Sequence, residues 1–239
     1  MASGVAVEMM TGDFLLWRCL HGGPLSRDAL DRWAPDAEMP WARYRARNLP
    51  LIAKLTDVYG ACAVLARHGG DIVGQLRFYP KAVWEMEGAG FLCLQQDYPS
   101  GPSDDFSSLV FPLQEKLDDQ TLKIHCLMTG SPSEKVNPYQ RRGIGARMVR
   151  KLIEWSREKG WKRIEAESFE DLPLIYQVTG SAGRLFWEKL GFCAADRFPH
   201  PFLREYGDFV KELEAQALQA GIDIEKAKDS IIMRLDLVP

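Results

Sequence analysis

The sequence lacks features that mark several whole classes of protein. Its 239 residues include five cysteines, which are scattered and never form a C-x-x-C pair. This pattern argues against a disulfide framework and against a zinc site. No apolar run approaches the roughly 18 residues of a transmembrane helix, so we expect no membrane span. Residues 1–11 lack the basic start and apolar stretch of a signal peptide, and we therefore expect a cytoplasmic protein.

Charge of one sign is not in excess either. Lys and Arg number 30 and Asp and Glu 33, which gives a net charge of −3. Nucleic-acid-binding domains usually carry a net basic stripe. One basic run with interleaved aromatics, residues 41–47, could contact RNA, although a solvated helix face suits it better in an acidic chain. We therefore predict no nucleic-acid partner, no membrane partner and no metal.

What the sequence does contain is the composition of a globular protein, with 46% hydrophobic and 26% charged residues. Strand and helix patterns alternate along the chain, and no Gly- or Ser-rich linker divides it. We predict a single α/β (α+β) domain spanning 1–239, with an insertion near 97–120 and an extra helix near 204–220. The expected strands are 13–20, 61–67, 72–79, 91–95, 121–129, 163–169, 192–198 and 231–237. The expected helices are 26–33, one from Pro40 that Pro50 kinks or splits, 144–160, 181–190 and 204–220.

One short segment carries a chemical signal. Residues 140–146, Gln-Arg-Arg-Gly-Ile-Gly-Ala, lie between a predicted strand and the most regular predicted helix. The first N–H groups of a helix have no intrahelical acceptor and favour an anion. Gly143 and Gly145 let a large ligand approach the backbone, and Arg141 and Arg142 add positive charge. The segment is neither a dinucleotide fingerprint, because Met148 takes the third glycine's place, nor a Walker A loop. It predicts a site for an anion such as a pyrophosphate.

Three separated motifs resemble the GNAT acyltransferase superfamily, and they follow one another along the chain in the family's order. Gln140 to Gly145 fits the pyrophosphate-loop pattern R/Q-x-x-G-x-G/A of that family. Gly70 to Gly74 resembles its second-to-third strand hairpin, and Gly183 to Phe192 resembles its late motif A-x-x-F-Y-E-K-x-G-F. The resemblance implies a central mixed sheet, splayed in the middle and flanked by helices, with acetyl-CoA held in the splay.

The resemblance also implies an activity and a set of binding residues. Acetyl-CoA would serve as the acyl donor, and an amine of a small molecule or protein would attack it directly in a ternary complex. A homodimer is one expectation, because dimers are common in the family. The end of the preceding strand would pair with the pantetheine arm, and its N–H groups would polarise the thioester carbonyl. The expected cofactor-binding residues are Leu127, Met128, Thr129, Gln140, Arg141, Arg142, Gly143, Ile144, Gly145, Ala146 and Phe186.

The catalytic acid and base are less well marked. Trp187 stands where many relatives have a tyrosine that protonates the leaving thiolate, and Tyr176 is the nearest upstream phenol. We predict Tyr176 as the general acid and Glu167 as the general base.

Other residues remain alternatives for the base. They are Glu165, Glu134 and His125. Strand alternation places His125 and Cys126 on opposite faces, which argues against a dyad and favours packing for Cys126.

A second class of function stays open because of Trp187. The chain could be a catalytically silent sensor or regulatory module that binds CoA on the same fold. A structural or RNA-associated protein that uses Arg43, Arg45 and Arg47 is the weaker third hypothesis.

Overall fold

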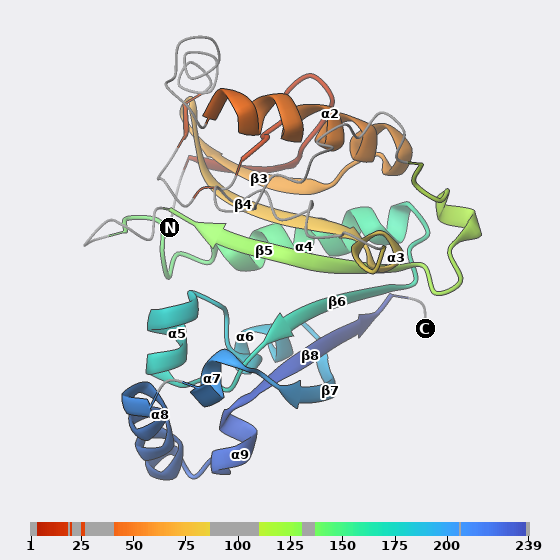
Figure 1. Cartoon of the computed structure of the whole chain (residues 1–239). Coiled ribbons are helices and arrows are strands. Elements are labelled where there is room, and N and C mark those ends of the chain that lie inside the picture. The colour runs from red at the N-terminus through yellow and green to blue at the C-terminus, as the bar shows by residue number, and fades with distance from the viewer. Residues whose placement is uncertain are drawn as a thin grey trace. The chain divides into compact units, whose positions relative to one another are not determined.

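The computed structural model describes residues 4–18, 20, 25–26, 41–86, 110–130, 137–205 and 207–237. The chain divides into two compact units, which we call unit 1 (Met1–Trp161) and unit 2 (Lys162–Pro239). Each unit combines antiparallel strands with helices (Figure 1), so the α/β fold class expected from the sequence is confirmed.

Unit 1 is built on an antiparallel sheet. Its strands run in the order β1-β3-β4-β5, and β2 also pairs with β4. Their bounds are Val5–Met9 for β1, Leu25–Ser26 for β2, Ala63–His68 for β3, Asp71–Pro80 for β4 and Thr121–Thr129 for β5. The hairpin predicted around Gly69 and Gly70 is confirmed, because β3 and β4 pair across it.

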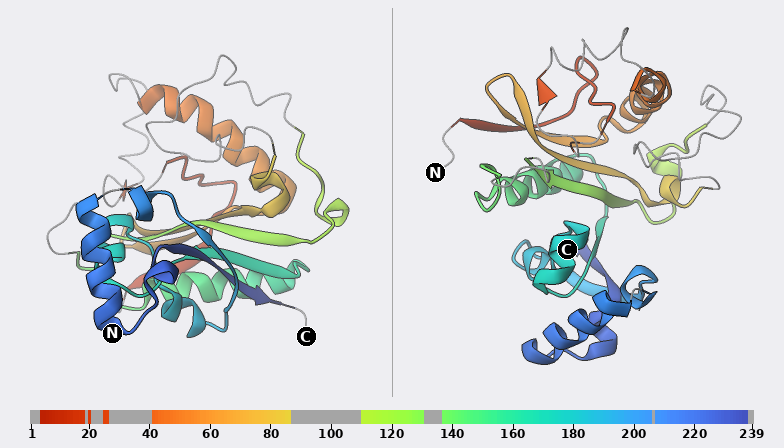
Figure 2. Two further views of the ribbon diagram at one scale, coloured as in Figure 1. Left: turned by 60° about the horizontal axis from the view of Figure 1, so that its bottom comes forward. Right: turned by 60° about the vertical axis from the view of Figure 1, so that its left-hand side comes forward.

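Two long helices flank this sheet. Helices α2 (Trp41–Tyr59) and α4 (Ile144–Glu158) lie on opposite faces of it (Figure 2). Helix α4 contacts β1, β3, β4 and β5. It turns its predicted apolar stripe inward, and the buried members include Ile144, Met148, Val149 and Leu152. Pro50 lies inside α2 without splitting it.

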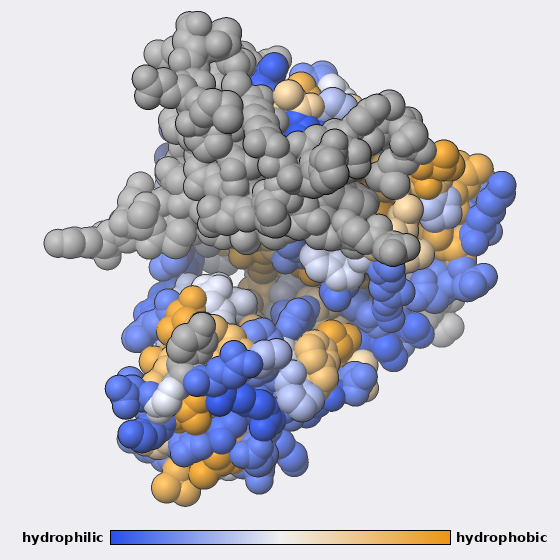
Figure 3. Space-filling model, in the orientation of Figure 1, coloured by the Kyte–Doolittle hydropathy of each residue, from blue (hydrophilic) through white to orange (hydrophobic). Residues whose placement is uncertain are grey.

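Short elements complete unit 1. Helix α3 (Lys81–Trp84) follows β4, and the 3-10 turn η3 (Gln114–Lys116) precedes β5. Hydrophobic side chains reach the surface around η3 (Figure 3), where Val110 and Leu113 are exposed.

Strand β5 contains an irregularity that sets which side chains share a face. Arg77 of β4 lies opposite Cys126, but the next residue, Phe78, lies opposite Ile124. Between these two pairs β5 has one residue more than β4, His125, which is the pattern of a β-bulge. Phe78 packs on Trp155 of α4 at 5.3 Å between ring centroids, so Phe78 and Ile124 face α4.

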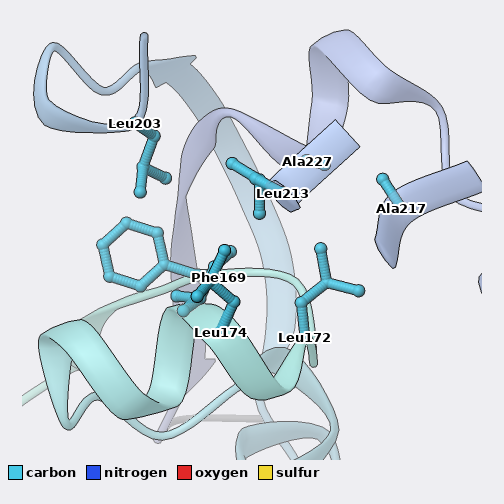
Figure 4. Packing of buried hydrophobic residues seen from close by; sticks show 8 residues of the cluster. Phe169, Leu172, Leu174, Leu203, Leu213, Ala217 and Ala227 are labelled. Carbon is cyan, nitrogen blue, oxygen red and sulfur yellow. The ribbon is translucent and has the colours of Figure 1, made fainter. Parts of the chain in front are cut away.

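The strands of unit 2 pair antiparallel in the order β6-β8-β7. The bounds are Arg163–Ser168 for β6, Cys193–Pro199 for β7 and Asp229–Asp236 for β8. Its helices are α5 (Pro173–Thr179), α6 (Arg184–Glu188), α7 (Phe202–Glu205), α8 (Gly207–Ala220) and α9 (Ile224–Ala227). A core cluster that includes Phe169, Leu174, Leu203 and Leu213 packs α5, α7, α8 and α9 together (Figure 4).

Some predicted elements are wrong. Residues 13–18 form no strand; instead the carbonyls of Leu16 and Trp17 accept side-chain hydrogen bonds from Arg77 and Asn48. Ser26 lies in β2, and residues 27–33 of the helix expected at 26–33 lie outside the described residues. The helix expected at 181–190 is only the shorter α6.

Other predictions fall partly or wholly outside the described residues. The expected strand 91–95 and residues 97–109 of the expected insertion are among these. The helix expected near 204–220 is present as the end of α7 and as α8. None of the described helices combines the length and the hydrophobicity needed to span a bilayer.

Candidate cofactor-binding site

The loop before α4 has an unusual backbone that only certain residues tolerate. Gly143 is the N-cap of α4 and has φ 74°, a left-handed conformation that disfavours residues with a side chain. Two residues earlier, Arg141 also has a positive φ of 57°. Among the described residues, none beyond the glycine's chain neighbours and the helix's own backbone comes within 4 Å of a Cβ added at Gly143. The glycine is therefore required by the backbone turn, and the space in front of it is open.

The N-terminus of α4 can accept an anion. No side chain caps it at Gly143, and the Arg147 N–H makes a helical bond of 3.0 Å back to the Gly143 carbonyl. The earlier N–H groups of the first turn, from Ile144 to Ala146, therefore point along the axis without an intrahelical acceptor. Gln140, Arg141 and Arg142 are exposed beside them. Helix dipole, free donors and two guanidinium groups together favour a phosphate group here.

Asn137 fastens this loop to the end of β5. Its Nδ2 donates to the Thr129 carbonyl at 2.8 Å, and its Oδ1 accepts from the Tyr139 N–H at 3.0 Å. The Asn137 amide occupies the place that a Cβ of Gly130 would take. Sequence analysis missed Asn137, although an asparagine two residues before a turn residue is a known turn signal.

A second contact holds the same loop to the β3–β4 hairpin. The Tyr139 hydroxyl and His68 Nδ1 lie 3.2 Å apart, and the two rings meet edge to face at 5.9 Å. Both contacts position the loop relative to β5 without using the side chains of the predicted phosphate-binding residues.

The predicted strand residues lie at the end of β5 that leads into this loop. Leu127, Met128 and Thr129 are half-buried and pair with Leu76, Gln75 and Gly74 of β4 along one edge of β5. Within unit 1, Asn137 thus ties the loop that contains residues 140–143 to this strand end.

The bulge in β5 corrects the expected placement of His125 and Cys126. The ring of His125 contacts Tyr79, which lies on the face of β4 opposite to Phe78, and Cys126 pairs with Arg77 on that same face. His125 and Cys126 therefore share the face turned away from α4, and the prediction of opposite faces is wrong. It failed because a period of two holds only for a strand without an inserted residue.

The predicted acid and base both belong to unit 2. Tyr176 lies on α5 with 47% of its surface exposed. Glu167 is exposed on β6, and its Oε1 accepts a hydrogen bond of 2.6 Å from Ser230 Oγ. Glu165, in contrast, is buried and accepts two hydrogen bonds from Arg234, at 3.0 and 2.8 Å. An ion-paired, buried carboxylate is a poor base, and Glu134 lies outside the described residues.

The late motif contributes packing. Trp187 is buried, and its ring meets Phe186 and Phe192 edge to face at 5.1 and 5.2 Å. Phe186 is half-buried and remains accessible to a ligand. The indole has no acidic proton near neutral pH, so Trp187 does not replace a catalytic tyrosine.

The cysteines and metal-ligating residues offer no rival chemistry in the described part of the chain. Burial raises the pKa of the Cys62 thiol, which disfavours the nucleophilic thiolate. Cys126 is half-buried and Cys193 is exposed. Within the described ranges, no three His, Cys, Asp or Glu side chains gather as metal ligands.

Comparison with known proteins agrees with the sequence resemblance. Residues 136–175 match the model of the acetyltransferase (GNAT) family, a segment that holds Asn137, the glycine loop, α4 and β6. No curated protein matches the chain significantly.

Solved acetyltransferase structures align over nearly the whole chain at low identity. A GNAT family acetyltransferase from Elizabethkingia anophelis with acetyl-CoA bound shares 15% identity, with a TM-score of 0.41, over 98% of this chain and 99% of that one. The ribosomal-protein-S18-alanine N-acetyltransferase from Escherichia coli shares 11%, with a TM-score of 0.42, over 98% and 95%. The IAA acetyltransferase from Bacillus cereus shares 13%, with a TM-score of 0.41, over 98% and 99%.

Proposed function

We propose that this chain, whose residues 136–175 match the acetyltransferase (GNAT) family, is an acetyl-CoA-dependent N-acetyltransferase with an amine of a small molecule or protein as acceptor. The observation that carries the proposal is the open left-handed turn at Gly143, which leads into an uncapped helix and is tied to the end of β5 by Asn137.

These residues fit the donor in two ways. The first-turn N–H groups of α4, with Arg141 and Arg142, would hold its pyrophosphate. The backbone of Leu127 to Thr129 would align its pantetheine arm and turn N–H donors toward the thioester carbonyl. When bound, acetyl-CoA supplies the activated acetyl group. Tyr176, whose phenol is exposed, is the proposed proton donor to the leaving sulfur, and Glu167 stays the base predicted from the sequence.

The experiment that tests this proposal compares two glycines of one helix. Gly143 and Gly160 flank the N- and C-terminal ends of α4, have φ of 74° and 75°, and face open space. Gly143→Ala and Gly160→Ala should each cost about 1–2 kcal/mol of stability, because alanine disfavours this conformation. In a calorimetric titration, only Gly143→Ala should weaken acetyl-CoA binding, by about tenfold or more, because its methyl group lies where the pyrophosphate would approach.

The contradicting outcomes are specific. Equal affinities in the two variants would show that the loop does not hold the donor. Absence of binding to the wild-type chain would remove the acetyl-CoA proposal altogether.

A silent CoA-binding module is the second candidate, and the burial of Trp187 favours it, because no phenol stands at that position. The two candidates differ in turnover. An enzyme releases free thiol from acetyl-CoA with at least one member of a broad panel of amines, whereas a sensor binds acetyl-CoA and releases none.

A further inference from the structure

Three rings gather on the face of the unit 1 sheet that is turned away from α4. They are Tyr79 of β4, Trp84 of α3 and His125 of β5, and we call them the aromatic triad. The ring centroids of Trp84 and His125 lie 4.9 Å apart, and those of Tyr79 and His125 lie 6.0 Å apart. Tyr79 and Trp84 are stacked, with 6.4 Å between centroids and 13° between planes.

His125 lies at the bulge of β5. Counted from Ile124, which faces α4, it points to the opposite face, toward Tyr79, and the bulge keeps Cys126 on that same face. His125 and Trp84 are both half-buried, so their rings are reachable from solvent. His125 also precedes the proposed arm-binding residues 127–129 by two positions on the same strand.

A cation already lies on the triad. Lys123 Nζ is 5.1 Å from the centroid of the Trp84 ring, and Lys123 pairs with Tyr79 on the same face. The negative face of an indole attracts ammonium groups at this distance. Lys123 therefore shows, within the molecule, that an ammonium group fits against this ring.

We propose that the aromatic triad is the acceptor subsite: Trp84 holds the ammonium group of the acceptor, His125 accepts its proton, and the fully buried Tyr79 supports both rings from below. This inference rests on the proposed function and deepens it, because it names a primary ammonium as the recognised group and a catalytic residue in unit 1.

The step balances with groups that are at hand. One proton passes from the acceptor ammonium to the neutral imidazole of His125, which takes this role in place of Glu167, and then to water. A nitrogen–carbon bond forms to the acetyl group, the carbon–sulfur bond breaks, and a second N–H proton ends on the sulfur. Histidine suits this transfer because its ordinary pKa lies near neutral pH.

Other charged or titratable groups near His125 come from the elements packed on β5. Strand β4 contributes Tyr79 and Arg77, β5 itself contributes Lys123 and Cys126, and α3 contributes Lys81 and Glu85. Lys81 and Glu85 pair with each other, with 3.9 Å between nitrogen and oxygen. Lys123 is thus the cation that would lie against the Trp84 ring together with the acceptor.

The decisive measurement uses tetramethylammonium as the probe, since it binds aromatic faces but has no proton to give. Imidazole C–H signals of the full chain are followed by NMR as pH is varied, with and without the probe, and His125→Gln assigns the signal of His125. The probe should lower the pKa of His125 by about half a unit or more, because a second cation beside the ring disfavours the imidazolium.

Three variants sharpen this test. Trp84→Leu should weaken probe binding about 2- to 30-fold. Lys123→Met should strengthen probe binding, since it removes the internal cation, whereas Lys116→Met on η3 is the charge-matched control and should leave it unchanged. An unshifted His125, or equal probe affinity in wild type and Trp84→Leu, would overturn the subsite.

Turnover separates this inference from the proposed function. All these variants should keep wild-type affinity for acetyl-CoA, which depends on residues 140–146. With an amine that releases thiol, His125→Gln should lower kcat/KM about 100-fold or more and flatten its fall at acid pH. An unchanged pH profile, or no thiol release with any amine although acetyl-CoA binds, would overturn the proton transfer to His125.

Discussion

Two glycines of the β3–β4 hairpin lie four residues apart but have very different surroundings. A Cβ at Gly74 would lie 2.9 Å from Ala66 Cβ, 3.1 Å from Met148 Cε and 3.3 Å from the Met128 carbonyl oxygen. A Cβ at Gly70 would meet nothing within 4 Å. Gly74 therefore allows β3, β5 and α4 to approach the same point of β4, whereas Gly70 serves only the turn.

We expect Gly74→Ala to destabilise unit 1 by about 1–3 kcal/mol, because the methyl group overpacks a site bounded by Ala66 and backbone. Gly70→Ala should change stability by less than about 0.5 kcal/mol. Chemical denaturation of both variants checks this expectation. Equal denaturation midpoints for the two variants would show that the sheet and α4 move apart to admit the methyl group without a loss of stability.

Residue-level features were predictable where a local rule governs them. Gly143 and Gly145 stood out because a residue without a Cβ lets a ligand approach the backbone, and the left-handed turn at Gly143 needs such a residue. The role of Asn137 was missed because its partners, Thr129 and Tyr139, are fixed by the folded turn. The prediction that His125 and Cys126 lie on opposite faces was wrong because a bulge depends on register with β4, which the sequence of β5 alone does not encode.

At the scale of elements, helix α8 shows how one helix divides into a core side and a solvent side. Leu213 is fully buried in the cluster with Phe169, Leu174 and Leu203 (Figure 4). Leu218, on the same helix, is 74% exposed. Replacing leucine by alanine at both positions therefore compares the stability lost at a buried site with that lost at an exposed site of the same residue type.

Leu213→Ala should lower the stability of unit 2 by about 2–5 kcal/mol through lost burial and a cavity. Leu218→Ala should cost less than about 0.5 kcal/mol, because alanine is also a good helix former. Thermal unfolding followed by circular dichroism distinguishes the two. A Leu218→Ala loss as large as that of Leu213→Ala would mean that the exposed side of α8 is covered in solution.

Elements with a strong period were predicted well, and weak ones were not. Strand β5 was predicted with its observed bounds of 121–129, and α4 and α8 nearly so, because each carries a continuous periodic pattern. The strand at 13–20 was wrong because Leu16 and Trp17 are apolar for packing, while their carbonyls bind side chains of distant residues. Long-range partners of that kind are invisible to a local pattern.

At the scale of the whole molecule, ion pairs tie the last third of the chain together. Arg204 of α7 bonds Glu225 at 2.7 Å and Asp229 at 2.8 Å. Lys228 bonds Glu214 of α8 at 2.6 Å and Glu225 at 3.2 Å. Hydrogen bonds from Arg204, and then from Lys228, lower the pKa of Glu225.

This lowered pKa makes stability depend on pH with a definite sign. A carboxyl whose pKa is lower in the folded state stabilises the fold above its unfolded pKa, and the effect disappears as pH falls through the folded pKa. Glu225→Gln should therefore be less stable than wild type at pH 7, and the difference should shrink on acidification below the ordinary pKa of 4.5. Urea midpoints measured from pH 7 to pH 3 test this. Glu205→Gln, a change at an exposed glutamate of α7, is the control, and a gap that widens in acid would contradict the assignment.

The bulge in β5 has a consequence for how this strand can change over evolution. Before His125, even-numbered residues such as Ile124 face α4; after it, odd-numbered ones such as Leu127 do. The residues that face α4 thus change once from even to odd numbers along the strand. Both halves turn their apolar side chains toward α4 only while that one extra residue is kept. Substitutions along β5 can accumulate singly, but loss of one residue would turn half of the strand inside out. We therefore expect the number of residues in β5 to be kept more strictly than the identity of its side chains.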